Sequence, residues 1–320
     1  MNIGTDENIC KNEYKEYRNC TLCPRGCGAD RSIKTGVCNS TDKCRIVRAA
    51  LHYWEEPCIS GKNGSGTIFF AGCTLGCVFC QNYEISDGKS LYGVEVDVDR
   101  LVEIFFELEA KGANNINFVT PTHYMPHIRD AIKRAKEKGF KLPFIYNTSG
   151  YERTESLREL DGLIDVYLPD MKYFDKELAA RYSKAPDYVE CVMSAIEEMV
   201  RQTGATGFDE NGIIQRGVIV RHMILPAHTK DSKNVIKYLY DTYGDDIYIS
   251  IMNQYTPVQT DRMKNYPELG RTITAREYDK VIDYAVELGV TNAYIQEGET
   301  CKESFIPDFD GEGCLKDKTK

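Results

Sequence analysis

Residues 69–82 read Phe-Phe-Ala-Gly-Cys-Thr-Leu-Gly-Cys-Val-Phe-Cys-Gln-Asn and place Cys73, Cys77 and Cys80 directly after a short apolar run. The apolar run predicts a β-strand, so the three cysteines share the loop that follows it. Soft thiolates gathered on one loop suit an iron–sulfur cluster. Three ligands leave one iron of a 4Fe–4S cluster open to another molecule, so this loop is a candidate catalytic site as well as an electron carrier.

A zinc site or a disulfide accounts for the three cysteines less well than a cluster does. A structural zinc site normally has four protein ligands. A disulfide would use two of the cysteines and leave the third thiol over. The spacing, the preceding strand and the aromatic Phe79 just before Cys80 together favour a cluster-binding loop.

Length and composition predict a globular protein with a sizeable core, since the chain has 320 residues of which 42% are hydrophobic. A net charge of -9 and a pI near 5.3 argue against a nucleic-acid binder. The first residues show no signal pattern, and no stretch reaches the roughly 18 apolar residues that cross a bilayer. We therefore expect a cytoplasmic protein without membrane contact, whose 13 cysteines serve as thiolate ligands rather than as disulfides.

The composition changes at a glycine-rich stretch, residues 61–66. We predict a cysteine-rich segment over residues 1–60, a main domain over 61–300 and a tail over 301–320. In the main domain, apolar runs alternate with helix-like segments, which predicts an α/β fold with a parallel sheet. The runs are 67–71, 116–120, 143–147, 163–168, 217–225 and 247–252, with a seventh at 292–295, and the helices are 99–111, 128–138, 188–203, 232–243 and 274–288. Six or so units fall short of an eight-unit barrel.

The Cys-x3-Cys-x2-Cys loop resembles that of the radical S-adenosylmethionine (SAM) superfamily. The resemblance implies a partial (β/α)6 barrel and a 4Fe–4S cluster whose open iron binds SAM. It also implies that an electron, supplied by a donor such as flavodoxin or ferredoxin, cleaves SAM to a 5'-deoxyadenosyl radical. That radical abstracts hydrogen from a substrate.

Four further stretches resemble a subgroup of that superfamily, the homologs of pyruvate formate-lyase activating enzyme. They are residues 52–61, 64–70, 117–123 and 146–151, and the similarity extends from about Cys20 to Asp310. It implies that the radical takes hydrogen from a glycine of a glycyl radical protein, although here the additional cysteines precede the cluster loop. The alternatives are a small-molecule or peptide substrate and, in another class, an iron–sulfur electron-transfer or metal-binding protein. Three cysteines disfavour the last, because it would use four per cluster.

The resemblance also indicates which residues hold SAM near the second strand. Many members contact the methionine amino group with Gly-Gly-Glu, where this chain has Thr120-Pro121-Thr122-His123. Pro121 has no amide hydrogen, so the hydroxyls of Thr120 and Thr122 and backbone carbonyls are the expected partners. For His123, a surface or capping role is the alternative. The adenine is usually held by backbone near the loop aromatic, here Phe79.

Three later strand ends supply polar candidates. Asp170 and Lys172 match an Asp-x-Lys pair of activating enzymes, and i and i+2 of a strand point the same way. The resemblance implies that Lys172 pairs with the SAM carboxylate, with an exposed ion pair as the alternative. Arg221 lies inside an apolar strand and is a candidate carboxylate ligand or a structural ion pair. Asn147 is a pocket or turn residue.

A second cysteine group precedes the main domain. Cys20, Cys23, Cys27 and Cys38 have a plausible metal-ligand spacing, and a short segment without its own core gains folding energy from a metal. Zinc and a second iron–sulfur cluster both fit, and unliganded structural cysteines are the alternative.

Overall fold

A ten-stranded sheet forms the centre of the molecule in the computed structural model, which describes residues 14–86, 93–296 and 306–316. The sheet order is β10-β9-β8-β6-β5-β4-β2-β1-β3, and β7 pairs with β8 beside this path. The strands are β1 (Arg45–His52), β2 (Ser65–Phe70), β3 (Val94–Glu95), β4 (Ile116–Val119), β5 (Phe144–Thr148), β6 (Val166–Pro169), β7 (Gly207–Phe208), β8 (Ile214–Met223), β9 (Tyr248–Met252) and β10 (Ala293–Ile295).

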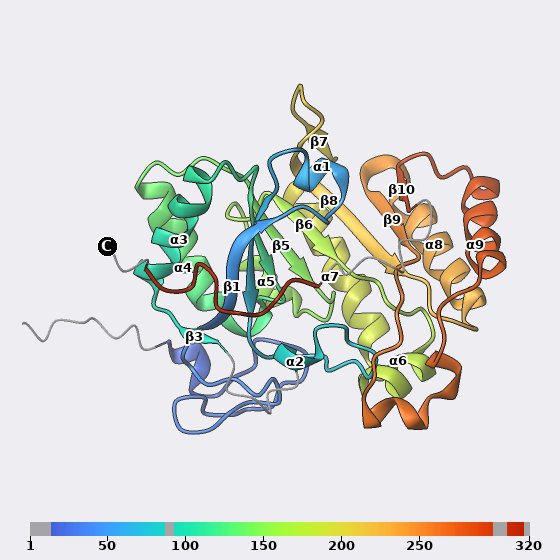
Figure 1. Cartoon of the computed structure of the whole chain (residues 1–320), viewed down its shortest axis with the longest axis horizontal. Coiled ribbons are helices and arrows are strands. Elements are labelled where there is room, and N and C mark those ends of the chain that lie inside the picture. Colours follow the sequence, from blue (N-terminus) through green and yellow to red (C-terminus); the bar gives the residue numbers. More distant parts are fainter. Residues whose placement is uncertain (1–13, 87–92, 297–305, 317–320) are drawn as a thin grey trace, which may run out of the picture.

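Helices connect the strands and cover the sheet, with α3 and α4 beside one end and α8 and α9 beside the other (Figure 1). The α-helices are α1 (Pro57–Ser60), α2 (Tyr83–Ser86), α3 (Val98–Ala110), α4 (Met125–Glu137), α5 (Thr154–Arg158), α6 (Lys176–Ser183), α7 (Tyr188–Thr203), α8 (Thr229–Tyr243) and α9 (Ala275–Leu288). Short 3-10 helices are η1 (Lys15–Tyr17), η2 (Thr122–Tyr124), η3 (Gly244–Asp246), η4 (Asp261–Asn265) and η5 (Pro267–Leu269). Among the described residues, no helix is both long enough and apolar enough to span a membrane.

The predicted α/β class is confirmed. Strands β2, β4, β5, β6, β8, β9 and β10 pair in parallel, and each of the seven apolar runs overlaps one of them. Their order has two ends, as expected of a partial barrel rather than a closed one. Every residue of β2, β5 and β6 is buried, because helices and loops cover both faces of these strands.

Strand β1 comes from the cysteine-rich segment, where the sequence predicts no strand. It runs antiparallel to β2 and β3, and a register shift between Ile46 and Arg48 interrupts its alternation, which hides the strand pattern in the sequence. The tail also reaches β1, since Gly311 N donates to Val47 O at 3.1 Å and Ala49 N to Glu312 O at 2.8 Å. Hydrogen bonds therefore cross both predicted boundaries, and the division of the chain at residues 60 and 300 stays a prediction.

Gly150 fixes how the ends of β5 and β6 approach each other. Its φ is +76°, and a Cβ there would collide with the carbonyl oxygen of Asp170 and with Val192. Glycine alone combines this left-handed backbone with the close approach. The turn thereby holds the residues that end β5 against the residue that follows β6.

Candidate active site

A cavity of about 450 Å³ lies at the carboxyl ends of the parallel strands. The segments that follow β2, β4, β5, β6 and β9 all contribute to its wall, among them Cys73, Thr120, Ser149, Asp170 and Gln254. Ligand sites of parallel α/β folds occur at this end of the strands. The cavity has the size of a small-molecule site.

The three sulfurs of the cysteine loop each receive a hydrogen bond from a different donor. Ser183 Oγ donates to Cys77 Sγ at 3.0 Å, and Ser86 Oγ donates to Cys80 Sγ at 3.4 Å. The backbone N–H of Leu75 donates to the third sulfur, that of Cys73, at 3.4 Å. Hydrogen bonds to ligand sulfurs are among the features that set the potential of an iron–sulfur cluster.

The chemistry of this loop fits a cluster better than a single ion. Within the described ranges, no group of three or more His, Cys, Asp or Glu side chains is gathered closely enough for one metal ion. Cluster thiolates bind different iron atoms, so they need not converge on one point. Burial and the neighbouring Cys73 and Cys77 raise the pKa of Cys80 to about 12, so metal binding must release its thiol proton.

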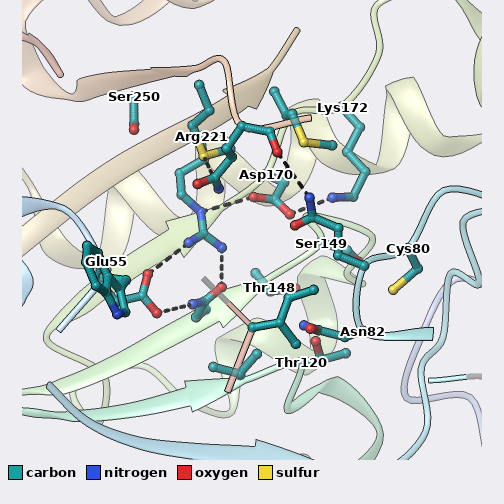
Figure 2. A pocket seen from close by; sticks show the side chains of 18 of the residues that line it. Glu55, Cys80, Asn82, Thr120, Thr148, Ser149, Asp170, Lys172, Arg221 and Ser250 are labelled. Carbon is teal, nitrogen blue, oxygen red and sulfur yellow. Dashed lines mark hydrogen bonds and ion pairs between the residues drawn. The ribbon is translucent and has the colours of Figure 1, made fainter. Parts of the chain in front are cut away.

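An ion network forms the wall beside the cysteine loop, as Figure 2 shows. Arg221 donates from Nε to Asp170 Oδ1 at 3.1 Å, from Nη1 to Glu55 Oε2 at 3.1 Å and from Nη2 to Asn147 Oδ1 at 2.5 Å. Lys172 Nζ donates to the other oxygen of Asp170, Oδ2, at 2.6 Å. The structure thus brings four predicted residues from three different strands or strand ends, Asn147, Asp170, Lys172 and Arg221, into one hydrogen-bonded group.

The charges of this group stabilise one another. Burial alone would raise the pKa of Asp170, but Lys172 and Arg221 outweigh it and hold that pKa below its usual value. Burial would likewise lower the pKa of Lys172, yet Asp170 and then Cys77 raise it. All three side chains are therefore ionised at neutral pH.

Arg221 and Lys172 differ in how many of their N–H donors have hydrogen-bond partners. Arg221 bonds to three side chains from different parts of the chain, which fix the plane of its guanidinium. Lys172 uses one of its three N–H donors on Asp170 and lines the cavity. Lys172 is thus the better placed cation for a ligand carboxylate, and Arg221 is the better placed one for holding the wall together.

Glu55 and Glu56 are site residues that the sequence patterns did not predict. Both line the cavity and are buried, and they follow β1, whose end pairs with the start of β2, so they approach from the amino ends of the parallel strands. Glu55 Oε1 accepts from Asn117 at 3.0 Å, and burial raises its pKa. Glu56 Oε2 has no hydrogen-bond partner among the described residues. The adjacent glutamates at 55–56, within one of the stretches that carried the resemblance, were the available signal.

Of four further residues considered in the sequence, two line the cavity and two do not. Thr120 lines the cavity with a φ of +57°, a strained backbone for a non-glycine residue. Phe79 lines it too and packs edge-on against three tyrosines. Thr122 is not among the described lining residues, because its hydroxyl donates to the buried Glu152 at 2.5 Å. His123 is buried rather than exposed, and its Nε2 lies 2.7 Å from Ala71 O.

The N-terminal cysteines adjoin the cluster loop without lining its cavity. Cys20 and Cys38 are buried, Cys23 is half-buried and Cys27 is exposed. The backbone N–H of Cys73 donates to the carbonyl of Cys38 at 3.3 Å, so the two cysteine groups are in direct contact.

The chain resembles several known proteins. The model of the radical SAM superfamily matches residues 67–239, more than half of the chain. The uncharacterized protein MJ0674 of Methanocaldococcus jannaschii is 28% identical over 293 residues, which cover 89% of this chain and 79% of that protein. A domain of pyruvate-formate lyase-activating enzyme from Bacteroides vulgatus is 15% identical, with a TM-score of 0.40 and coverage of 58% of this chain and 100% of that domain. The FeFe-hydrogenase maturase HydG from Carboxydothermus hydrogenoformans is 13% identical, with a TM-score of 0.48 and coverage of 75% of this chain and 55% of HydG.

Glu152 gives the region behind the site a pH dependence. Burial raises its pKa from 4.5 to about 7, although Thr122 and Thr148 donate to it. The folded protein therefore keeps a proton that the unfolded chain loses, so this contribution to stability is full below about pH 4.5 and disappears as the pH rises to about 7.

We expect the free energy of unfolding to fall between pH 5 and pH 7.5 by about 2 kcal/mol more in the wild type than in Glu152→Gln. Urea unfolding at both pH values measures the difference, with Glu155→Gln at an exposed site as the control. Equal pH dependence in the wild type and Glu152→Gln would contradict the raised pKa.

Proposed function

The chain belongs to the radical SAM superfamily, and from this premise we propose that its cysteine loop and the adjoining cavity generate a radical that removes hydrogen from a substrate. Superfamily membership implies a 4Fe–4S cluster and SAM. When bound, the cluster supplies the electron that cleaves SAM to methionine and a 5'-deoxyadenosyl radical. The observation that carries the proposal is the placement of Cys73, Cys77 and Cys80 beside a cavity whose wall presents Lys172.

The cysteine loop would hold three of the four irons. The donors from Ser183, Ser86 and the backbone of Leu75 reach the sulfurs and fix their orientation. They would also offset negative charge on the thiolates. The loop would leave the fourth iron without a cysteine ligand, so that iron would be available to SAM.

Lys172 would pair with the carboxylate of SAM through its remaining N–H donors. Asp170 orients this lysine, and Arg221 holds Asp170 from the other side. The hydroxyl and carbonyl of Thr120 would accept hydrogen bonds from the amino group of SAM. The backbone near Phe79 would hold the adenine. In this assignment Arg221 positions Asp170 and, through it, Lys172, and does not itself contact SAM.

The first candidate substrate is a glycine of a glycyl radical protein, which the similarity of four stretches to the homologs of pyruvate formate-lyase activating enzyme supports. The second is a small molecule, because the cavity of about 450 Å³ continues past the ion network to Glu56, whose free carboxylate oxygen would accept a hydrogen bond from such a substrate. In both cases the electron donor would be a low-potential carrier such as flavodoxin or ferredoxin.

The reductive cleavage of SAM is directly measurable. We expect the anaerobically reconstituted protein, reduced with dithionite in the presence of SAM, to form 5'-deoxyadenosine, and Cys77→Ser to form none because an iron ligand is lost. Cys191→Ser, which changes a half-buried cysteine outside the cavity, is the matched control and should keep full activity. Equal product from the wild type and Cys77→Ser would contradict the proposal.

The role of Lys172 predicts a binding defect. Lys172→Met should weaken SAM binding to the reconstituted protein about 10- to 100-fold, since a charge-assisted hydrogen bond contributes roughly 1.5–3 kcal/mol. Equilibrium dialysis measures the affinity. Lys176→Met removes an exposed lysine on α6 and should change nothing. Unchanged affinity in Lys172→Met would assign the carboxylate to another group.

The substrate is tested by EPR. Incubation with a glycyl radical protein encoded in the same genome, together with SAM and reductant, should give the doublet of a glycine-centred radical. If 5'-deoxyadenosine forms but the doublet is absent with every such partner, the small-molecule substrate replaces the glycine.

A further inference from the structure

A second sulfur-rich site adjoins the cluster loop. Backbone hydrogen bonds of 3.0 Å from Cys20 N to Ala29 O and from Gly28 N to Cys20 O close a tight hairpin that carries Cys20, Cys23 and Cys27. Cys38 comes from the next loop. A Cβ at Gly36 would lie 3.4 Å from Cys38 Sγ and 3.5 Å from Cys27 Sγ, so both sulfurs border one small space that glycine leaves open.

Arg31 lies among these sulfurs and is completely buried. Its guanidinium donates to the carbonyls of Ser40, Thr41 and His123, and it stacks over the ring of Tyr17 at 4.3 Å. Its Nη1 is 3.9 Å from Cys20 Sγ. In the part of the chain that the structure describes, no carboxylate forms an ion pair with Arg31, and burial lowers the pKa of Arg31 while the thiols of Cys38 and Cys20 and the hydroxyls of Tyr17 and Tyr124 raise it.

A buried guanidinium without a neighbouring anion lowers the free energy of unfolding. Arginine keeps its charge in proteins, and an uncompensated buried charge costs several kcal/mol. Neutral thiols do not offset it. Four thiolates around a zinc ion or around an oxidised 4Fe–4S cluster form a net dianion, which would supply the missing negative charge.

We propose that Cys20, Cys23, Cys27 and Cys38 bind one metal centre through four thiolates, with Arg31 as its buried counter-charge. The shared chemistry is tetrathiolate coordination, and the metal is zinc or iron with sulfide. These sulfurs, as described, are not gathered closely enough for a single ion, which is equally true of Cys73, Cys77 and Cys80. A cluster would take the thiolates on separate irons, whereas a zinc ion would require them to move closer together.

The metal centre would also stabilise the cysteine loop that carries Cys73, Cys77 and Cys80. Cys73 N donates to Cys38 O, and Arg25, between Cys23 and Cys27, donates to the carbonyls of Thr74 at 3.0 Å and Leu75 at 2.9 Å. One backbone bond and two bonds from the Arg25 side chain thus connect the two cysteine groups. Fixing the four thiolates consequently fixes the loop that carries the other three.

Metal analysis of the full chain tests the site directly. In a Cys73→Ser/Cys77→Ser/Cys80→Ser background, reconstituted in parallel with zinc and with iron plus sulfide, we expect about one zinc or about four irons to remain per chain. Adding Cys23→Ser and Cys38→Ser should remove this metal, and adding Cys191→Ser should not. Sulfide content distinguishes the cluster from zinc. No metal in the triple variant, or unchanged metal in the quintuple one, would overturn the proposal.

A measurement on the wild type avoids any folding defect of these variants. Cys27 is exposed, so as a free thiol it should react quickly with N-ethylmaleimide, whereas a metal ligand is protected. We expect mass spectrometry to show Cys27 alkylated at least tenfold faster after metal removal with EDTA and ferricyanide, followed by reduction of the freed thiols and removal of the reductant, and Cys191 unaffected. Equal rates for Cys27 before and after metal removal would overturn the site.

Two substitutions of Arg31 test its role as the counter-charge of the metal centre. Arg31→Lys keeps a cation, and Arg31→Met removes it at similar length. We expect the folded fraction of Arg31→Lys to retain several times more metal than that of Arg31→Met. Equal retention would remove Arg31 from the proposal.

Discussion

The contact of the Arg221 guanidinium with Asp170, Glu55 and Asn147 is the interaction on which the site depends. A charge in an apolar strand is tolerated only with hydrogen-bonded partners, and here each partner comes from a different segment. One side chain therefore ties β8 to the ends of β5 and β6 and to the segment after β1. Because Asp170 also bonds Lys172, the network that holds these strand ends together orients the lysine that lines the cavity.

This arrangement gives the cavity two chemically different ends. One end has the sulfurs of the cysteine loop, and the other has Glu55 and Glu56, which enter from the amino ends of the strands. Figure 1 shows α1, which follows the glutamates, and α2, which follows the cysteine loop, at opposite ends of the sheet's strands. A radical made at the sulfur end would meet a substrate anchored toward the glutamate end.

The sequence predicted what depends on local pattern. Apolar runs located the parallel strands, and the spacing of Asp170 and Lys172 placed both on one wall. It did not predict Glu55, whose partner Arg221 is 166 residues away, because the meeting of two distant segments leaves no local pattern. Thr122 was expected at the cofactor, but a 3-10 turn directs its hydroxyl to Glu152 instead. Strand β1 went unrecognised because a register shift breaks its alternation.

The central claim is that the cysteine loop would hold a cluster whose open iron binds SAM, and that Lys172 would bind the carboxylate of SAM. The EPR spectrum of the reduced, reconstituted protein, recorded with and without SAM, tests it most directly, because a ligand on the cluster alters its electronic structure. We predict a changed spectrum in the wild type, which Lys172→Met shows only at higher SAM concentration. A spectrum that SAM leaves unchanged at saturating concentration would contradict the account.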